Sequence, residues 1–194
     1  PIGVERNLRV LMPDGVALRT DHLYPRTNAP CPTILLRSPY YGARWSRSDM
    51  AGLLYMMLVP LFAQRGYHVV VQTTRGRYDS QGEFTPCCNE REDGLATVNW
   101  VSQQLWFNGS LGMWGASYDG LVQWAVAGEA PPCLQAMVPV ITSSSFSELL
   151  YPGGVPSDFL LLYASVMEMG ADPSATTLSM LRKASLGAMG RTIG

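Results

Sequence analysis

The sequence has 194 residues, of which 47% are hydrophobic and 15% are charged, and its formal net charge is −1 at pH 7. A chain of this length and composition is expected to fold as one domain, or as one domain and part of another, and its composition excludes intrinsic disorder. The small net charge provides no basic surface, so neither nucleic acid nor a membrane is expected as a partner.

The first half of the chain predicts a hairpin followed by two strands of a buried sheet. Residues 4–11 and 16–24 are extended segments joined by Pro-Asp-Gly at 13–15, a strong signal for a tight turn. Two further apolar runs lack polar alternation, which is typical of parallel strands covered on both faces, at residues 33–37 and 67–73. A helix is expected between these two strands, at residues 46–65.

The second half continues this alternation. Residues 89–104 have apolar positions at helical spacing, and acidic residues in the first turn favour the positive end of the helix dipole. A short strand, a helix and another buried strand are expected next, at residues 111–114, 118–127 and 134–141. This alternation predicts an α/β fold with a mixed, mostly parallel sheet covered by helices. From Ser143 onwards, a serine-rich turn and an apolar helix at 157–169 indicate an inserted helical segment.

Residues 115–120, Gly-Ala-Ser-Tyr-Asp-Gly, carry the strongest sign of chemistry. Ser117 stands at a strand-to-helix turn, as in the nucleophile elbow of an α/β-hydrolase. The flanking glycines are needed because side chains in so sharp a turn would collide with the neighbouring strand and helix. The predicted strand and helix place the serine Oγ at the carboxyl edge of the sheet, where ligands bind. Ser117 is therefore the candidate nucleophile, and an incidental serine in a plain strand–turn–helix connection is the alternative.

The partners that a serine nucleophile needs are only partly present. The two histidines, His22 and His68, both precede Ser117, whereas this fold supplies its base after the nucleophile, so we expect both to be structural. Tyr40 follows the strand expected beside the nucleophile strand. Its hydroxyl could donate to a developing oxyanion together with the backbone N–H of Tyr118. Taken alone, Pro-Tyr-Tyr at 39–41 indicates a turn with packed aromatic rings.

Four stretches, taken together and in order, are more specific than the elbow. They read M-P-D-G-V-A-L at 12–18 with Asp21 and Tyr24-Pro25 beyond it, L-R-S-P-Y at 36–40, Q-T-T-R-G-R-Y-D-S-Q-G-E-F at 72–84, and W-F-N-G-S-L-G-M-W-G-A-S-Y-D-G at 106–120. Together they resemble the cocaine esterase and X-Pro dipeptidyl-peptidase group of serine hydrolases, the peptidase S15-like or CocE/NonD family. Thr73 stands where that family has an aspartate of structural character.

The resemblance implies an α/β-hydrolase fold in which Ser117 is the nucleophile, and Tyr40 and the Tyr118 N–H form the oxyanion hole. It implies a small ester or peptide substrate, no cofactor and no metal, and it gives Asp119 no role. Family members continue through a helical cap and return to the core with the triad aspartate and then the histidine. We therefore expect residues 1–142 to be the N-terminal part of the core, truncated after the sixth strand, and 143–194 to begin the cap.

Such a chain is expected to be nearly inactive by itself. It is also expected to expose an apolar sheet edge, which invites aggregation or pairing with another chain. The whole protein from which it comes is compatible with a homo-oligomer. The alternative is a non-catalytic binding module or pseudoenzyme that acts through this edge. A nucleotide-binding domain is excluded because no Gly-rich phosphate loop follows the first strand. The cysteines lack the spacing of a zinc site and are expected to be free thiols: Cys31, Cys87, Cys88 and Cys133. Because no signal peptide is visible either, a cytoplasmic location is expected.

Overall fold

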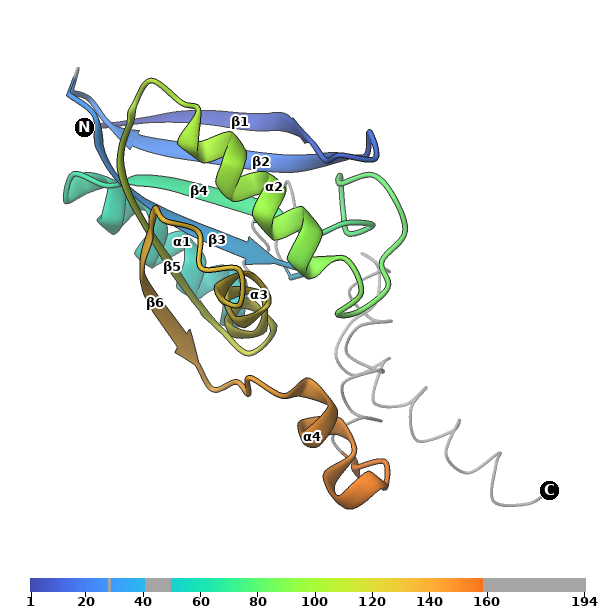
Figure 1. Ribbon diagram of the computed structural model, residues 1–194. Helices are drawn as coiled ribbons and strands as arrows, with labels where there is room; N and C mark the ends of the chain where they lie inside the picture. Colours follow the sequence, from blue (N-terminus) through green and yellow to red (C-terminus); the bar gives the residue numbers. More distant parts are fainter. Residues whose placement is uncertain (28, 41–49, 159–194) are drawn as a thin grey trace. The chain divides into compact units, whose positions relative to one another are not determined.

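In the computed structural model, which describes residues 1–27, 29–40 and 50–158, the described strands form one sheet of six in the order β1-β2-β4-β3-β5-β6 (Figure 1). The hairpin β1–β2 and the pair β2–β4 are antiparallel, and the other neighbouring strands are parallel. The predicted mixed, mostly parallel sheet is therefore confirmed. The strand bounds are β1 Ile2–Leu11, β2 Ala17–Pro25, β3 Cys31–Ser38, β4 His68–Thr73, β5 Phe107–Ala116 and β6 Leu134–Val140.

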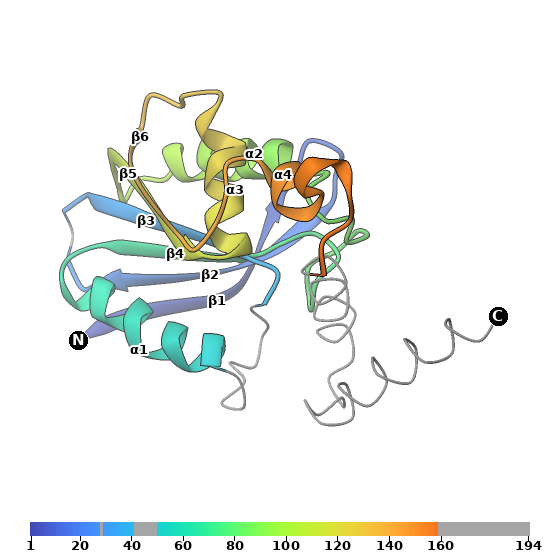
Figure 2. The same ribbon diagram turned by 90° about the horizontal axis from the view of Figure 1, so that it is seen from below.

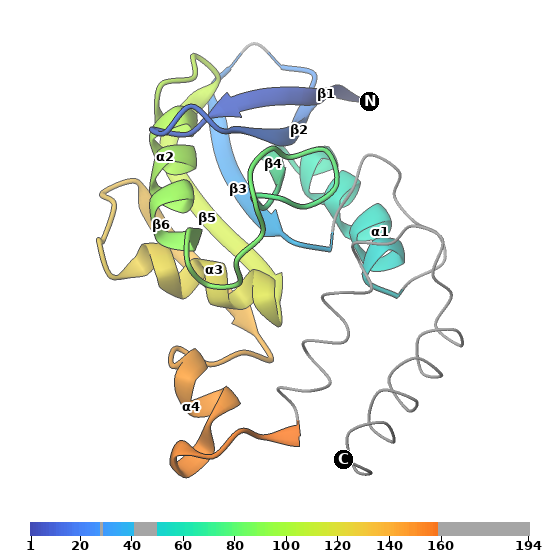
Figure 3. The same cartoon turned by 90° about the vertical axis from the view of Figure 1, so that its right-hand side faces the viewer.

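Helices cover both faces of this sheet. Helix α1 (Met50–Gln64) lies on one face, and α2 (Glu90–Ser102) and α3 (Tyr118–Ala127) lie on the other (Figures 2 and 3). Side chains alternate between the faces of a strand, so Leu36 packs with the α1 cluster while its neighbour Leu35 packs with the α2 and α3 cluster. Burying an apolar side chain of this size stabilises the fold by about 1.5–3 kcal/mol. The apolar runs of the central strands thus follow from their two covered faces.

The predicted hairpin turn is also confirmed. The Met12 N–H donates to the Val16 carbonyl oxygen at 2.8 Å, and the Gly15 N–H donates to the Met12 carbonyl oxygen at 2.9 Å. Gly15 has φ +85°, a conformation that side-chain-bearing residues rarely adopt.

Strand β6 departs from its prediction. It was expected to be buried, yet Val138 is 50% exposed and the strand contains no fully buried residue. Within the described residues, β6 pairs only with β5, so its outer edge has no strand partner there. The apolar composition identified the strand correctly, but burial depends on what covers both faces and both edges. The expectation of a buried strand is wrong for the described part of the chain.

The chain divides into two compact units, Pro1–Ser144 and Ser145–Gly194. The described part of the second unit contains α4 (Phe146–Leu150) and the short 3-10 helix η1 (Pro152–Gly154). The Ser145 hydroxyl caps α4 by accepting from the Glu148 N–H at 3.4 Å. Most of the helix predicted at 157–169, and the first residues of that predicted at 46–65, lie outside the described residues, so a cap at 143–194 stays a prediction. Among the helices that can be described, none has the length and apolarity to cross a membrane.

Candidate active site

The turn between β5 and α3 has a strained backbone at Ser117. Its φ is 58° and ψ is −122°, values that cost a non-glycine residue about 1–3 kcal/mol. The Ser117 N–H donates to the Val140 carbonyl oxygen at 2.8 Å. The Ser117 carbonyl oxygen accepts from the N–H groups of Gly120 and Leu121 at 3.0 and 3.1 Å. These hydrogen bonds fix the backbone on both sides of Ser117. Its side chain is exposed and stands at the carboxyl edge of the sheet, where β5 ends.

Two glycines make this turn possible, as the sequence predicts. A Cβ added to Gly115 would lie 2.4 Å from the Cβ of Asp119, and one added to Gly120 would lie 2.6 Å from Cγ2 of Thr142. Both distances are far below van der Waals contact. The close approach of α3 to β5 and to the segment after β6 therefore depends on the absence of side chains at both positions.

The structure brings the three predicted site residues together. Tyr40 follows β3, which pairs in parallel with β5, and its phenol lies close enough to the Ser117 side chain and the Tyr118 backbone for hydrogen bonding to them to affect its pKa. Burial raises the pKa of Tyr40 above its usual 10, and the nearby Asp119 raises it further, while both hydrogen bonds lower it. The phenol therefore keeps its proton at neutral pH and can donate it to an acceptor.

The loop after β4 holds the Tyr40 segment in place, a role that the sequence does not reveal. The Arg77 Nε donates to the Pro39 carbonyl oxygen at 3.1 Å, and the Tyr78 hydroxyl donates to the Tyr40 carbonyl oxygen at 3.1 Å. Gly76 has φ +66°, and a Cβ there would lie 2.1 Å from the Phe84 nitrogen. The Arg-Gly stretch that resembles the family thus supports the backbone on either side of the Tyr40 peptide.

Asp119 is a buried acid beside this site and is 1% exposed. Burial raises its pKa well above the usual value, and a hydrogen bond with Ser38 acts in the opposite direction. The dipole of α3 also favours the carboxylate, but such an effect is worth only about 0.3–1 kcal/mol at a surface. The Ser38 Oγ in turn accepts from the Tyr40 N–H at 3.2 Å. Asp119 is therefore linked through Ser38 to the backbone that carries Tyr40.

Arg75 connects the hairpin turn to α2. Its guanidinium contacts the Asp93 and Asp14 carboxylates, each at 2.6 Å. The Asp93 carboxylate is 1% exposed, whereas Asp14 lies at the surface. The two hydrogen-bonded carboxylates raise the pKa of Arg75.

Thr73, which replaces the family's aspartate, is buried at the end of β4, where its carbonyl oxygen accepts from the Ser80 hydroxyl at 2.8 Å.

The two histidines lie away from Ser117. His68 begins β4, whereas Ser117 follows the end of β5, which runs in the same direction, so they belong to opposite edges of the sheet. The His68 Nδ1 and His22 Nε2 atoms share a 2.8 Å hydrogen bond, and His22 Nδ1 lies 2.9 Å from a Glu5 oxygen. Trp106 stacks on both imidazoles. Neither ring is placed to take a proton from Ser117.

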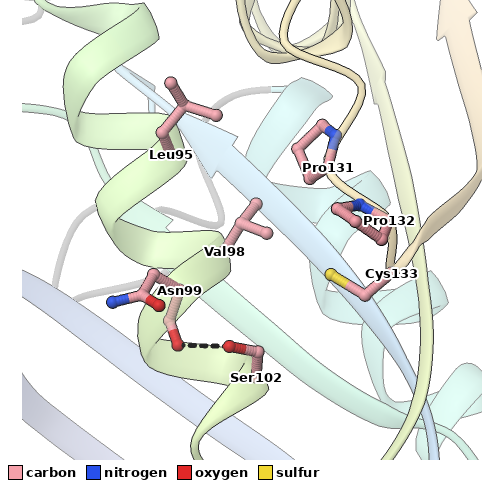
Figure 4. A pocket seen from close by; sticks show the side chains of 7 residues that line it. All are labelled: Leu95, Val98, Asn99, Ser102, Pro131, Pro132 and Cys133. Carbon is pink, nitrogen blue, oxygen red and sulfur yellow. Dashed lines mark hydrogen bonds between the residues drawn. The ribbon is translucent and has the colours of Figure 1, made fainter.

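Within the described residues, a hollow lies apart from this site. This hollow of about 330 Å³ lies between α2 and the segment before β6, with Leu95, Val98 and Cys133 in its wall (Figure 4). It lies at the amino end of β6, opposite to the edge that carries Ser117. Throughout the described ranges, no three His, Cys, Asp or Glu residues are close enough to hold a metal ion.

Residues 14–185, nearly the whole sequence, match the family X-Pro dipeptidyl-peptidase (S15 family). The chain belongs to this family. The cocaine esterase of Rhodococcus sp. (strain MB1 Bresler) is 35% identical over 164 residues, which cover 82% of the chain and 27% of the esterase. The chain thus spans about a quarter of that relative's length.

Solved structures show the same fold. A CocE/NonD family hydrolase of Staphylococcus aureus superimposes with a TM-score of 0.74 and 24% identity, over 93% of this chain and 36% of the hydrolase. An aminopeptidase from the marine sediment archaeon Thaumarchaeota archaeon has a TM-score of 0.61 and 25% identity, over 73% of this chain and 26% of the aminopeptidase. The predicted α/β-hydrolase fold is confirmed, and the family is one of serine hydrolases.

Proposed function

We propose that this chain supplies the nucleophile and the oxyanion hole of a serine hydrolase that cleaves esters or amides through an acyl-serine intermediate. The observation that carries the proposal is the convergence of the Tyr40 phenol, the Ser117 side chain and the Tyr118 backbone. In the reaction, the Ser117 Oγ attacks the carbonyl carbon, and the carbonyl oxygen becomes an oxyanion. The Tyr40 O–H and the Tyr118 N–H donate to that oxygen, and each such donor is worth about 10²–10³-fold in kcat.

The proton of Ser117 needs a base, and neither histidine of the chain is placed to act as one. We propose that the base and its carboxylate partner come from outside these 194 residues. The length of the cocaine esterase, of which the matched segment is 27%, supports this. The base would pass the proton of Ser117 to the leaving group as the tetrahedral intermediate collapses to the acyl-serine, and it would then activate the water that hydrolyses the acyl-serine. The 194 residues by themselves should then acylate slowly.

A small ester is the substrate class that we propose, because the cocaine esterase is the relative that shares 35% identity. The family name leaves a dipeptide amide ending in proline as the competing substrate. The test measures kcat/KM for p-nitrophenyl acetate and for Ala-Pro-p-nitroanilide with the protein expressed from its complete coding sequence. We expect faster turnover of the ester, and Ser117→Ala should lower it by at least about 10⁴-fold. Hydrolysis that survives this substitution would overturn the proposal.

A non-catalytic binding module is the second candidate. It is favoured by the exposed outer edge of β6 in the described residues and by the absence of a histidine near Ser117. The same measurement separates the two candidates. A folded wild-type protein that is no more active than Ser117→Ala on either substrate would support the binding module.

A further inference from the structure

The side chain of Tyr118 is fixed by a buried contact that the proposed chemistry does not use. Its hydroxyl donates to Oε1 of Glu90 at 2.8 Å and accepts from the Cys87 N–H at 2.9 Å. Tyr118 is 1% exposed and Glu90 is 3% exposed, so water does not compete for this bond. A residue whose N–H faces the site is thus held through its ring by the first residue of α2.

Glu90 is itself tied to the centre of the sheet. Nη1 of Arg37 donates to the Glu90 carbonyl oxygen at 2.9 Å and lies 3.2 Å from Oε2 of the Glu90 carboxylate. Arg37 belongs to β3 and is fully buried, and its Nε donates to Oε1 of Gln72 on β4 at 2.9 Å. The anchor of Tyr118 is therefore part of the rigid core and not of a surface loop.

The charges fix the direction of the bond. Burial raises the pKa of Tyr118 far above its usual 10, and the neighbouring Glu90 charge raises it further. The phenol therefore stays protonated and donates, and the carboxylate paired with Arg37 accepts. Hydrogen bonds to an ionised acceptor are shorter and stronger than those between neutral groups.

We propose that Glu90 is a positioning residue for the oxyanion hole. By holding the Tyr118 ring, it fixes the first turn of α3 and thereby the direction of the Tyr118 N–H. The need arises at Ser117, whose strained φ of 58° directly precedes this peptide. A misplacement of about 1 Å at a reacting centre can cost about 10²-fold in rate. This inference rests on the proposed function for its effect on catalysis, but not for its effect on the backbone.

Three substitutions test the contact; Glu90→Leu also removes the carboxylate beside the buried Arg37, so Tyr118→Phe is the variant that removes the hydrogen bond alone. Tyr118→Phe removes the hydroxyl and keeps the backbone N–H, Glu90→Leu removes the acceptor, and Glu90→Gln keeps an acceptor oxygen. Glu92→Leu is the matched control, because this acid lies on the same helix but is exposed. With p-nitrophenyl acetate, we expect Tyr118→Phe and Glu90→Leu each to lower kcat about 10-fold with KM within about threefold. Glu90→Gln should recover most of the loss, and Glu92→Leu should match the wild type.

The double variant Tyr118→Phe/Glu90→Leu tests whether both changes act through one bond. We expect its kcat to be no lower than that of the worse single variant, because the bond can be lost only once. Unchanged kcat in folded single variants, or losses that multiply in the double variant, would overturn the inference. If the wild type and Ser117→Ala are equally inactive, the proposed function fails instead.

A second measurement decides the inference without catalysis. Amide hydrogen exchange at the Tyr118 N–H can be followed by NMR in the 194-residue chain. We expect exchange to be about 10-fold faster in Tyr118→Phe and Glu90→Leu and unchanged in Glu92→Leu, because the anchored turn would open more often. Equal exchange rates in all four proteins would overturn the positioning role, whether or not the protein hydrolyses esters.

Discussion

Arg75 and Asp93 form an ion pair with 2.6 Å between Nη2 and Oδ1, and the Asp93 carboxylate is 1% exposed. The pair connects the loop after β4 to the first turn of α2, and the same loop carries Arg77 and Tyr78 to the backbone of Tyr40. The support of the candidate oxyanion donor thus begins at a buried charge pair outside the site.

Loss of this pair should destabilise the protein strongly. Arg75→Met leaves the Asp93 carboxylate buried without its cation, which typically costs about 3 kcal/mol or more. The control is Arg91→Met, since Arg91 pairs with Glu129 at the surface, where such pairs contribute about 0–1 kcal/mol. Urea denaturation of both variants measures the difference. Equally small losses would contradict a buried structural role for Arg75.

The partners of the buried acids are the part of the site that the sequence does not reveal. The acids at the start of residues 89–104 are explained equally well by the helix dipole, yet Glu90 and Asp93 are buried against Arg37 and Arg75. Asp119 had no predicted role, because its burial beside Ser38 also depends on contacts between elements that are distant in sequence. A pattern of residue types indicates that a helix begins, but not which of its side chains face inward across elements distant in sequence.

The backbone features were easier to predict. The elbow follows from local chemistry, because glycines, a strand and a helix adjoin Ser117 in the sequence itself. Adjacency of Tyr40 to Ser117 needed the topology as well, and the apolar runs without alternation predicted that parallel sheet correctly. The prediction that β6 is buried was wrong for the described residues, since an apolar run carries no information on what covers the faces of a strand.

The elbow glycines should be intolerant of alanine. In Gly120→Ala the new Cβ would lie 2.6 Å from Cγ2 of Thr142, and overpacking of this kind typically costs about 1–3 kcal/mol. Gly128→Ala is the control at the end of the same helix, because nothing lies within 4 Å of a Cβ there. We expect Gly120→Ala to lower the free energy of unfolding and Gly128→Ala to leave it unchanged or raise it. A reversed order would contradict the close approach of α3 and Thr142.

Acid should destabilise the fold through the two histidines. Burial and, to a smaller extent, the charge on His22 together lower the pKa of His68 from 6.5 to about 4. Between pH 6.5 and about 4, His68 binds more protons in the unfolded chain than in the folded one. The free energy of unfolding therefore falls as the pH drops from 6.5 towards 4. In His68→Phe, which keeps an aromatic ring against Trp106, this fall should be smaller. Urea denaturation at several pH values measures it, and equal slopes for both proteins would exclude His68 as the source.

Asp119 should destabilise the fold in its ionised form. Its pKa is raised in the folded state, so the folded chain retains the proton longer than the unfolded one, and stability falls as the pH rises above the usual pKa of about 3.9. Asp119→Asn removes this titration, and we expect a higher free energy of unfolding than the wild type at pH 7. The exposed Glu83 supplies the control, since Glu83→Gln should change nothing. A lower free energy of unfolding for Asp119→Asn than for the wild type at pH 7 would contradict this, because it would mean that the folded protein stabilises the ionised Asp119 carboxylate.

Covalent labelling tests the nucleophile most directly. A fluorophosphonate should react with the protein expressed from its complete coding sequence, and peptide mass spectrometry should locate the adduct on Ser117. Tyr40→Phe should slow labelling by about 10²-fold, because the phosphonyl oxygen loses one oxyanion donor. An adduct on another residue, or a folded protein that acquires none, would contradict the assignment of Ser117 as the nucleophile.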